Sequence, residues 1–216
     1  MLHFNLFKAF ALMSLAGSLV AGANFSFSGS LATDDASQLF TFTLVSTSTV
    51  TLRTYSYAGG IDASGVTIPR GGFDPVLAVF DSTGLLINEN DDGNSNVPAD
   101  PVTGQQWDSY LQTTLAAGNY TVALTQYDNF AIGPTLNNGF FNTGNPHFTS
   151  SFGCTHGAFC DLTGANRTSA WEFDALGVSS ATVNAVPEPG LPSLLATGIV
   201  CIGVLRRGKL WNRRSR

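Results

Sequence analysis

Charged side chains are scarce in this sequence. They account for 12% of the 216 residues, about half the share that is usual in soluble proteins. Long surface helices depend on charged side chains for their solvent-facing side, so this scarcity argues against a mainly helical fold. Glycine is abundant, with 23 residues, and glycine concentrates at turns. The composition therefore predicts one turn-rich, all-β domain together with processing segments at the chain ends.

Positive charge is nearly absent from the centre of the chain. Between residues 24 and 186, Arg53, Arg70 and Arg167 stand against fourteen acidic residues, which gives a net charge of −11. A protein that binds nucleic acid needs a basic surface to displace counterions from the phosphates. The sequence therefore argues against nucleic acid as a partner and favours a cation.

Catalytic motifs are missing as well. The sequence contains neither a Gly-x-Ser-x-Gly nucleophile turn nor a His-Glu-x-x-His zinc motif. Removal of an N-terminal leader would leave two histidines, His147 and His156, for any catalytic triad. A pair of facing carboxylates, as in glycosidases, stays open as an alternative. We predict that the protein is not an enzyme, and a small secreted hydrolase is the third hypothesis.

Residues 1–23 have the layout of a secretory signal peptide. Lys8 precedes the apolar run AFALMSLAGSLVAGA, which ends in the small residues Ala21-Gly22-Ala23 that signal peptidase requires. A buried N-terminal helix is the alternative, but the strand-like stretch Asn24-Phe-Ser-Phe-Ser-Gly follows at once. We predict cleavage by signal peptidase after Ala23 and export of the remaining chain.

Residues 186–216 combine three features in sequence. Pro187-Glu188-Pro189 is followed by the uncharged run 191–205 and then by a basic end, 206–216, which begins with Arg206-Arg207. A helix over the uncharged run would be about 22 Å long, shorter than the roughly 30 Å hydrocarbon core of a membrane. We predict a short transmembrane helix that inserts transiently in the inner membrane, with the basic end in the cytoplasm.

This tail resembles the sorting tail of PEP-CTERM proteins, in which a Pro-Glu-Pro motif, a short hydrophobic helix and a terminal arginine cluster follow one another. The resemblance implies recognition by an exosortase, a membrane enzyme of Gram-negative bacteria that make exopolysaccharide. It also implies loss of the tail and delivery to the cell surface or extracellular matrix. An ordinary single-pass anchor is the alternative.

Between residues 24 and 185, short alternating runs are separated by clusters of Gly, Asn, Asp and Pro. Such a pattern is typical of an antiparallel β-sandwich. In one run the alternation places Phe40, Phe42 and Leu44 on the same face. The turns at 46–49, 81–84 and 117–119 are predicted to belong to hairpins. The expected strands cover residues 39–45, 50–55, 76–80, 85–88, 109–115, 120–127, 168–173 and 181–183.

Part of this region is similar to the bacterial pre-peptidase C-terminal domain. The similarity covers residues 71–93, with an Asp74-Pro75 start, a strand that ends in Phe80-Asp81 and an Asn90-Asp91-Asp92 loop, and extends to residues 115–124. The resemblance implies a jelly-roll-like β-sandwich.

Oxygen-bearing side chains gather on the loops of this region. Ca²⁺ binds six to eight such oxygens. If the loops lie at one end of the sandwich, repulsion between their carboxylates favours a cation between them. The alternative is turn capping, and the spacing fits no EF-hand. We predict calcium as a cofactor, held by Asp74, Asp81, Asn90, Asp91 and Asp92, with Asp128 at the end of another strand.

A long insert at about residues 130–162 contains two cysteines, Cys154 and Cys160. Because the chain is predicted to be exported, we expect them to form a disulfide that stiffens the insert by about 2 kcal/mol. His147 and His156 lie nearby, but the spacing lacks a four-ligand zinc pattern.

Phe140 and Phe141 lie in the same insert, within the polar stretch Asn-Asn-Gly-Phe-Phe-Asn. Two adjacent aromatic side chains do not easily face the interior together, so we predict that they contact a glycan. Core packing is the alternative, and it is the commoner role of a single aromatic residue in such a domain.

These features predict an exported, non-enzymatic surface or matrix protein of a Gram-negative bacterium. Its expected partners are signal peptidase, an exosortase and exopolysaccharide. The alternative function is that of a carbohydrate-binding module with a structural calcium ion.

Overall fold

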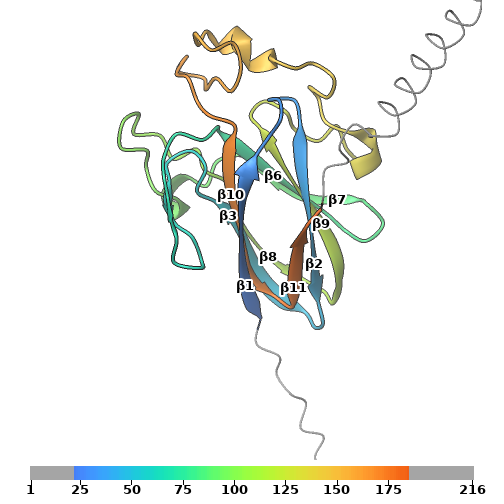
Figure 1. The fold of residues 1–216 in the computed structure, drawn as a ribbon. Coiled ribbons are helices and arrows are strands. Elements are labelled where there is room, and N and C mark those ends of the chain that lie inside the picture. Colours follow the sequence, from blue (N-terminus) through green and yellow to red (C-terminus); the bar gives the residue numbers. More distant parts are fainter. Residues whose placement is uncertain (1–21, 185–216) are drawn as a thin grey trace, which may run out of the picture.

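The computed structural model describes residues 22–184 and contains two antiparallel β-sheets packed face to face (Figure 1). The predicted β-sandwich is thereby confirmed. Residues 1–21 of the predicted signal peptide lie outside the described residues, and so does the whole sorting tail with Pro187, Glu188, Pro189, Arg206 and Arg207. Within residues 22–184 there is no helix with the length and hydropathy needed to cross a membrane.

The first sheet has four strands in the order β1-β10-β3-β8. They are β1 Ala23–Ser30, β10 Ala170–Val178, β3 Ser48–Thr54 and β8 Tyr110–Leu115. The second sheet has five strands in the order β11-β2-β9-β6-β7. They are β11 Ser180–Val183, β2 Ser37–Leu44, β9 Gly118–Gln126, β6 Pro75–Phe80 and β7 Leu86–Asn90.

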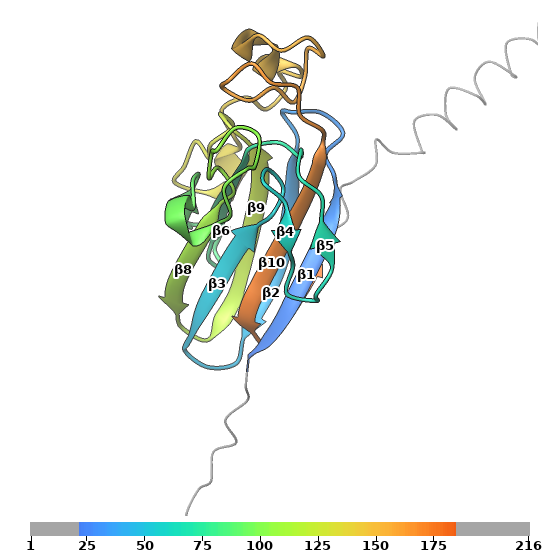
Figure 2. The same cartoon turned by 90° about the vertical axis from the view of Figure 1, so that its left-hand side faces the viewer.

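A short hairpin and three 3₁₀ turns lie outside the two main sheets. A short hairpin, β4 Gly60–Ile61 and β5 Thr67–Ile68, lies over the outer face of the first sheet (Figure 2). Three 3₁₀ turns follow along the chain, η1 Asn94–Asn96, η2 Leu136–Asn138 and η3 Phe148–Phe152. All eight expected strands are present, whereas β4 and β5 were not expected.

The hydrophobic core lies between the two sheets. In β2, Phe40, Phe42 and Leu44 are buried, as the alternation predicts. Burying each such side chain contributes about 1.5–3 kcal/mol to folding. The other strands supply the remaining core residues, among them Val50, Leu52, Leu77, Val79, Leu111, Val122, Leu124, Phe173 and Ala175.

One of the three predicted hairpins forms, and two predictions were wrong. β6 and β7 pair through the turn that contains Asp81 and Gly84, whose φ of +82° suits glycine. By contrast, β2 and β3 belong to different sheets, and so do β8 and β9. Their loops cross from one sheet to the other, because strands of a sandwich that follow one another along the chain often lie on opposite sides of one shared core.

The long connection from β9 to β10 is the predicted insert. Among its residues the strand-like pairings are isolated bridges. Its first part packs Ala131, Leu136 and Phe140 against Ala78 and Phe80 on the outer face of the second sheet. Its second part lies at one end of the sandwich (Figures 1 and 2).

Candidate metal centre

Three carboxylates meet where β6 begins and β7 ends. Asp74 immediately precedes β6, while Asp91 and Asp92 immediately follow β7. The two strands are antiparallel neighbours, so these positions lie at the same end of the sheet. One carboxylate oxygen from each residue lies within 4.8 Å of the others. We call Asp74, Asp91 and Asp92 the acidic cluster.

The carboxylates of the acidic cluster are buried deeply enough that their negative charge must be neutralised. Asp74 is only 3% exposed, and Asp91 and Asp92 are half-buried. The Oδ1 atoms of Asp74 and Asp91 are buried and accept no hydrogen bond from any described residue. Since burial of unpaired carboxylates is costly, this end of the sandwich needs either bound protons or a cation.

Burial also raises the pKa of all three carboxyl groups. For Asp74 burial acts first, and the charges of Asp91 and Asp92 raise its pKa further, well above the usual range. Burial, the charge of Asp92 and then the charge of Asp128 raise the pKa of Asp91 to about 7. The pKa of Asp92 is raised by burial. Groups that hold protons near neutral pH can exchange those protons for a divalent cation.

Two neighbouring residues shape the loop of the acidic cluster. The Asn90 side chain accepts the Tyr110 N–H at 2.8 Å and donates to the Asp92 carbonyl at 3.2 Å, so it holds the backbone. The buried Ser109 hydroxyl lies within hydrogen-bond distance of the carbonyls of Pro75 and Asp91, which joins the start of β6 to the end of β7. Sequence reasoning missed Ser109, because a lone serine at a strand start gives no signal.

Asp81 lies apart from the acidic cluster. It follows β6, whereas Asp74 precedes it, and about 20 Å of strand separates the two positions. The Asp81 carboxylate caps its own turn by accepting the N–H groups of Thr83 and Leu85. Asp128 follows β9 at the same end as the acidic cluster, and its exposed charge acts on Asp91.

Tyr127 lies next to the acidic cluster and contacts two other aromatic rings. The Tyr127 N–H donates to the Asp74 carbonyl at 2.8 Å. The Tyr127 ring lies 5.7 Å from the Phe130 ring and 6.2 Å from the Phe152 ring, measured between centroids. Burial raises the pKa of the Tyr127 phenol, and the charges of Asp128 and Asp91 raise it further, so the phenol lies within the field of the carboxylates.

The donor set of the acidic cluster fits a hard divalent cation. It consists of carboxylate oxygens, which Ca²⁺ prefers, and it contains neither the imidazole nor the thiolate ligands typical of zinc and copper. Three carboxylates supply fewer oxygens than the six to eight that surround Ca²⁺, so backbone carbonyls or water would complete the shell. The cluster can therefore hold a metal such as calcium.

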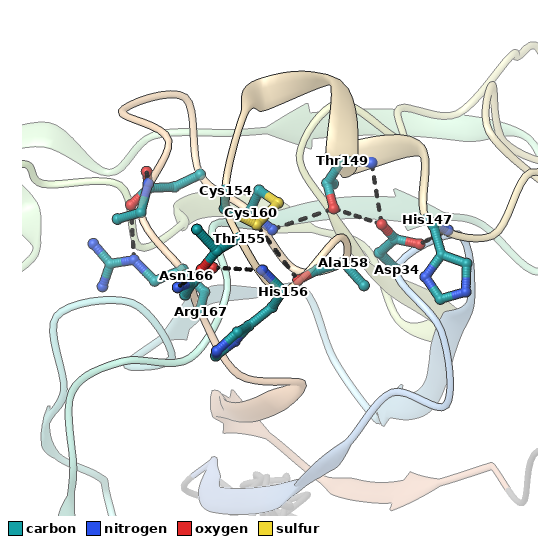
Figure 3. Close-up of a disulfide and its surroundings, with 12 residues drawn as sticks. Asp34, His147, Thr149, Cys154, Thr155, His156, Ala158, Cys160, Asn166 and Arg167 are labelled. Carbon is teal, nitrogen blue, oxygen red and sulfur yellow. Dashed lines mark hydrogen bonds and ion pairs between the residues drawn. A yellow bond between two sulfur atoms is a disulfide. The ribbon is translucent and has the colours of Figure 1, made fainter.

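The disulfide predicted between Cys154 and Cys160 is present, with the Cα atoms 5.5 Å apart (Figure 3). The Cys160 N–H donates to Thr149 at 3.2 Å, and Thr149 in turn contacts Asp34. A disulfide is typical of proteins that fold in an oxidising compartment. The structure therefore indicates an oxidising location, which suits a protein outside the cytoplasm.

Both histidines of the insert are held through their backbone. The His147 N–H donates to Asp34 at 2.6 Å, and the His156 N–H donates to Asn166 at 2.9 Å (Figure 3). Asp34 is fully buried beside the turn between β1 and β2, so it attaches the insert to the sandwich.

A buried ion network also attaches the insert, and sequence reasoning missed it. Arg167 contacts Asp161 at 2.7 Å and Asp100 at 3.1 Å, and its guanidinium lies 3.6 Å from the centroid of the Tyr57 ring. Arg70 reaches the same Asp100 at 2.8 Å. The scarcity of arginines marked these residues as unusual, but sequence offers no rule for pairing charges this far apart.

Glu172 is another buried acid that the sequence did not reveal. It lies on β10, is fully buried, and both carboxyl oxygens accept no hydrogen bond within residues 22–184. Burial and the neighbouring charge of Asp174 raise its pKa to about 10. Asp174 differs, because Arg53 pairs with it at 2.9 Å and the Ala63 N–H donates to it.

The two adjacent phenylalanines of the insert have opposite environments. Phe140 is 7% exposed and packs against the second sheet, whereas Phe141 is 67% exposed. The prediction of a glycan contact therefore rests on Phe141, and Phe140 takes part in packing.

Comparison with protein-family models finds no match for this chain, and a search of curated proteins finds no similar sequence.

Proposed function

We propose that this chain is an exported, non-enzymatic protein of a Gram-negative cell surface or exopolysaccharide matrix, processed by signal peptidase and an exosortase. One observation carries the proposal: the described sandwich begins at Ala23 in edge strand β1 and ends at Val183 in edge strand β11. Pro187 follows four residues later. Removal of residues 1–23 and of the tail would take away Ala23, the first residue of β1, and leave every described core residue in place. The disulfide suits the oxidising exterior.

The strand order supports the jelly-roll assignment. Apart from β4, β5 and β11, eight strands remain, four in each sheet, in the orders β1-β10-β3-β8 and β2-β9-β6-β7. Jelly rolls consist of eight strands in two sheets with Greek-key connections.

Several buried acids have structural roles, which supports a function other than catalysis. Asp108 accepts the N–H groups of Tyr57 and Ala58 together with the Thr54 hydroxyl. Asp161 caps a turn and pairs with Arg167. The oxygens of these carboxylates are therefore occupied by contacts that hold the fold together.

The sorting proposal is tested by intact mass and fractionation of the protein from an exopolysaccharide-producing host. With its exosortase, the host should yield a surface or released protein that lacks residues 1–23 and the segment after Pro189. The same host without exosortase should keep the full tail in the membrane fraction. A tail retained in both hosts would make the protein an ordinary anchored ectodomain.

We also propose that calcium is a cofactor and binds at the acidic cluster. Export would expose the protein to the calcium of the exterior, and Ca²⁺ would neutralise the unpaired oxygens of Asp74 and Asp91. Titration of the metal-stripped mature protein with Ca²⁺ in a calorimeter should show one saturable site. Asp91→Asn should abolish it, and Asp81→Asn, at the far end of β6, is the matched control that should retain it.

A further inference from the structure

We propose that the calcium ion at the acidic cluster directly binds a neutral polysaccharide, through vicinal hydroxyl groups of one sugar, with Tyr127 and Phe141 contacting the sugar ring. The inference rests on the calcium proposal above and extends it from a structural ion to a ligand-binding ion.

The three carboxylates of the acidic cluster are buried to different extents. Asp74 is almost fully buried and its Oδ1 atom has no described partner, so it faces the inner side of the site. Asp91 and Asp92 are partly exposed, so the outer side is reachable from solvent. Because three carboxylates leave several calcium positions unfilled, the solvent side can accept two oxygens from a ligand. Vicinal hydroxyls of a sugar supply such a pair.

Aromatic residues lie on the chain segments next to the acidic cluster. The Tyr127 backbone is hydrogen-bonded to Asp74, and its ring contacts Phe130 edge to face. Phe141 is joined to the same segment, because its N–H donates to the Phe130 carbonyl at 3.0 Å. Phe141 is 67% exposed, whereas every other Phe, Tyr and Trp within residues 22–184 is buried or half-buried. Exposed rings beside a polar site suit the apolar face of a sugar.

The charge of the site selects the class of polysaccharide. Asp74, Asp91, Asp92 and the nearby Asp128 carry four negative charges when ionised, and one Ca²⁺ leaves a net charge of −2. A polyuronate would be repelled by this charge and by the acidic body around it. An uncharged chain of hexoses meets no such repulsion, so we assign a neutral polysaccharide.

The test uses the mature protein, purified from the native host, and three soluble neutral polysaccharides: mannan, galactan and dextran. Binding is measured by calorimetry in Ca²⁺ and in EDTA, with alginate as the charged comparison. We expect at least one neutral polysaccharide to bind in Ca²⁺ only, with alginate at least tenfold weaker. Phe141→Ala should weaken this binding at least fivefold while Ca²⁺ binding is kept, and Ile61→Ala, an equally exposed apolar residue on β4, should change neither.

Each outcome decides between the two proposals. Absence of Ca²⁺ binding overturns both the calcium site and this inference. Binding of Ca²⁺ without binding of any neutral polysaccharide overturns the inference alone and leaves a structural ion. Binding that persists in EDTA or in Asp91→Asn also overturns the inference, because the sugar would then bind elsewhere. A preference for alginate contradicts the charge argument.

Discussion

Asp74 is the residue through which the proposed calcium ion would affect folding most directly. Asp74 is 3% exposed and its Oδ1 atom is unpaired, an arrangement that costs free energy unless a proton or a cation is bound. We predict that Asp74→Asn melts at the same or a higher temperature than the parent in EDTA, since it removes a buried carboxyl group that must take up a proton when no cation is bound. The variant should lose the stabilisation that Ca²⁺ gives the parent, about 2.7 kcal/mol at a hundred times Kd. Differential scanning calorimetry checks both, and a variant that still gains stability from Ca²⁺ would remove Asp74 from the site.

Glu172 gives a prediction about pH. Its pKa in the fold is raised to about 10, whereas an unfolded Glu ionises near 4.3, so the native state binds the extra proton between these values. Stability from this group is thus complete below about pH 4 and falls by up to about 1.4 kcal/mol per pH unit as pH rises towards 10. Glu172→Gln should flatten this decline and be more stable than the parent at pH 8, by about 1 kcal/mol or more. Urea unfolding from pH 5 to 9 measures it, and parallel curves would show an ionised Glu172.

Strand alternation predicts the burial of some residues in this chain and fails to predict the burial of others. Alternation correctly placed Phe40 and Phe42 in the core, because one period decides which face is buried. That rule puts Glu172 on the opposite face of β10 from Phe173 and leaves it in solvent. Instead the β4–β5 hairpin lies over that face, and such a cover depends on tertiary contacts that no local pattern encodes.

At the scale of elements, turn chemistry was a good guide to where strands end and a poor guide to which strands pair. Asp81 and Gly84 close a true hairpin between β6 and β7. The loop at residues 46–49 also marks the end of a strand, β2, but it leads to β3 in the other sheet. The local sequence determines where the chain turns. Which sheet the next strand joins depends on how the apolar faces of the two sheets pack against each other in the core.

The insert is predicted to depend on its disulfide for local order. A bridge closing the short loop from Cys154 to Cys160 contributes about 2 kcal/mol in the chain-entropy model. The intact mass should lie about 2 Da below that of the reduced protein. Replacing both cysteines with serine should lower stability by about this amount and raise hydrogen exchange in residues 147–167 while β2 and β9 stay protected. Alkylation of both cysteines in the untreated protein would contradict the pairing.

Arg167 is predicted to be the main attachment between the insert and the sandwich. Its side chain is 2% exposed and pairs with two buried carboxylates, those of Asp100 and Asp161. Arg167→Gln should cost about 3–5 kcal/mol, because it leaves buried charge unpaired. Arg70→Gln is the matched control: its side chain is 38% exposed, so its loss should cost about 1 kcal/mol or less. Chemical denaturation compares them, and equal effects would contradict a dominant role for Arg167.

At the scale of the whole molecule, the sequence predicted the architecture better than the site. A sandwich follows from strand spacing and composition, and the acidic residues at 74, 91 and 92 were correctly expected to lie close together, where they could hold one cation. The sequence alone could not show that Asp81 lies away from the acidic cluster. Which residues meet depends on which strand ends lie at the same end of the sheet. The strongly acidic body and the carboxylates gathered at one end are consistent with a protein whose stability depends on an external divalent cation.

The most direct test of this account is the melting temperature of the mature protein at pH 7.5, measured in millimolar Ca²⁺ and again in excess EDTA. We predict that Ca²⁺ raises the melting temperature by about 5–10 °C, the shift that about 2.7 kcal/mol produces in a domain of this size. Asp91→Asn should remove the difference and Asp81→Asn should keep it. An identical melting temperature with and without Ca²⁺ would contradict the assignment of the acidic cluster as a calcium site.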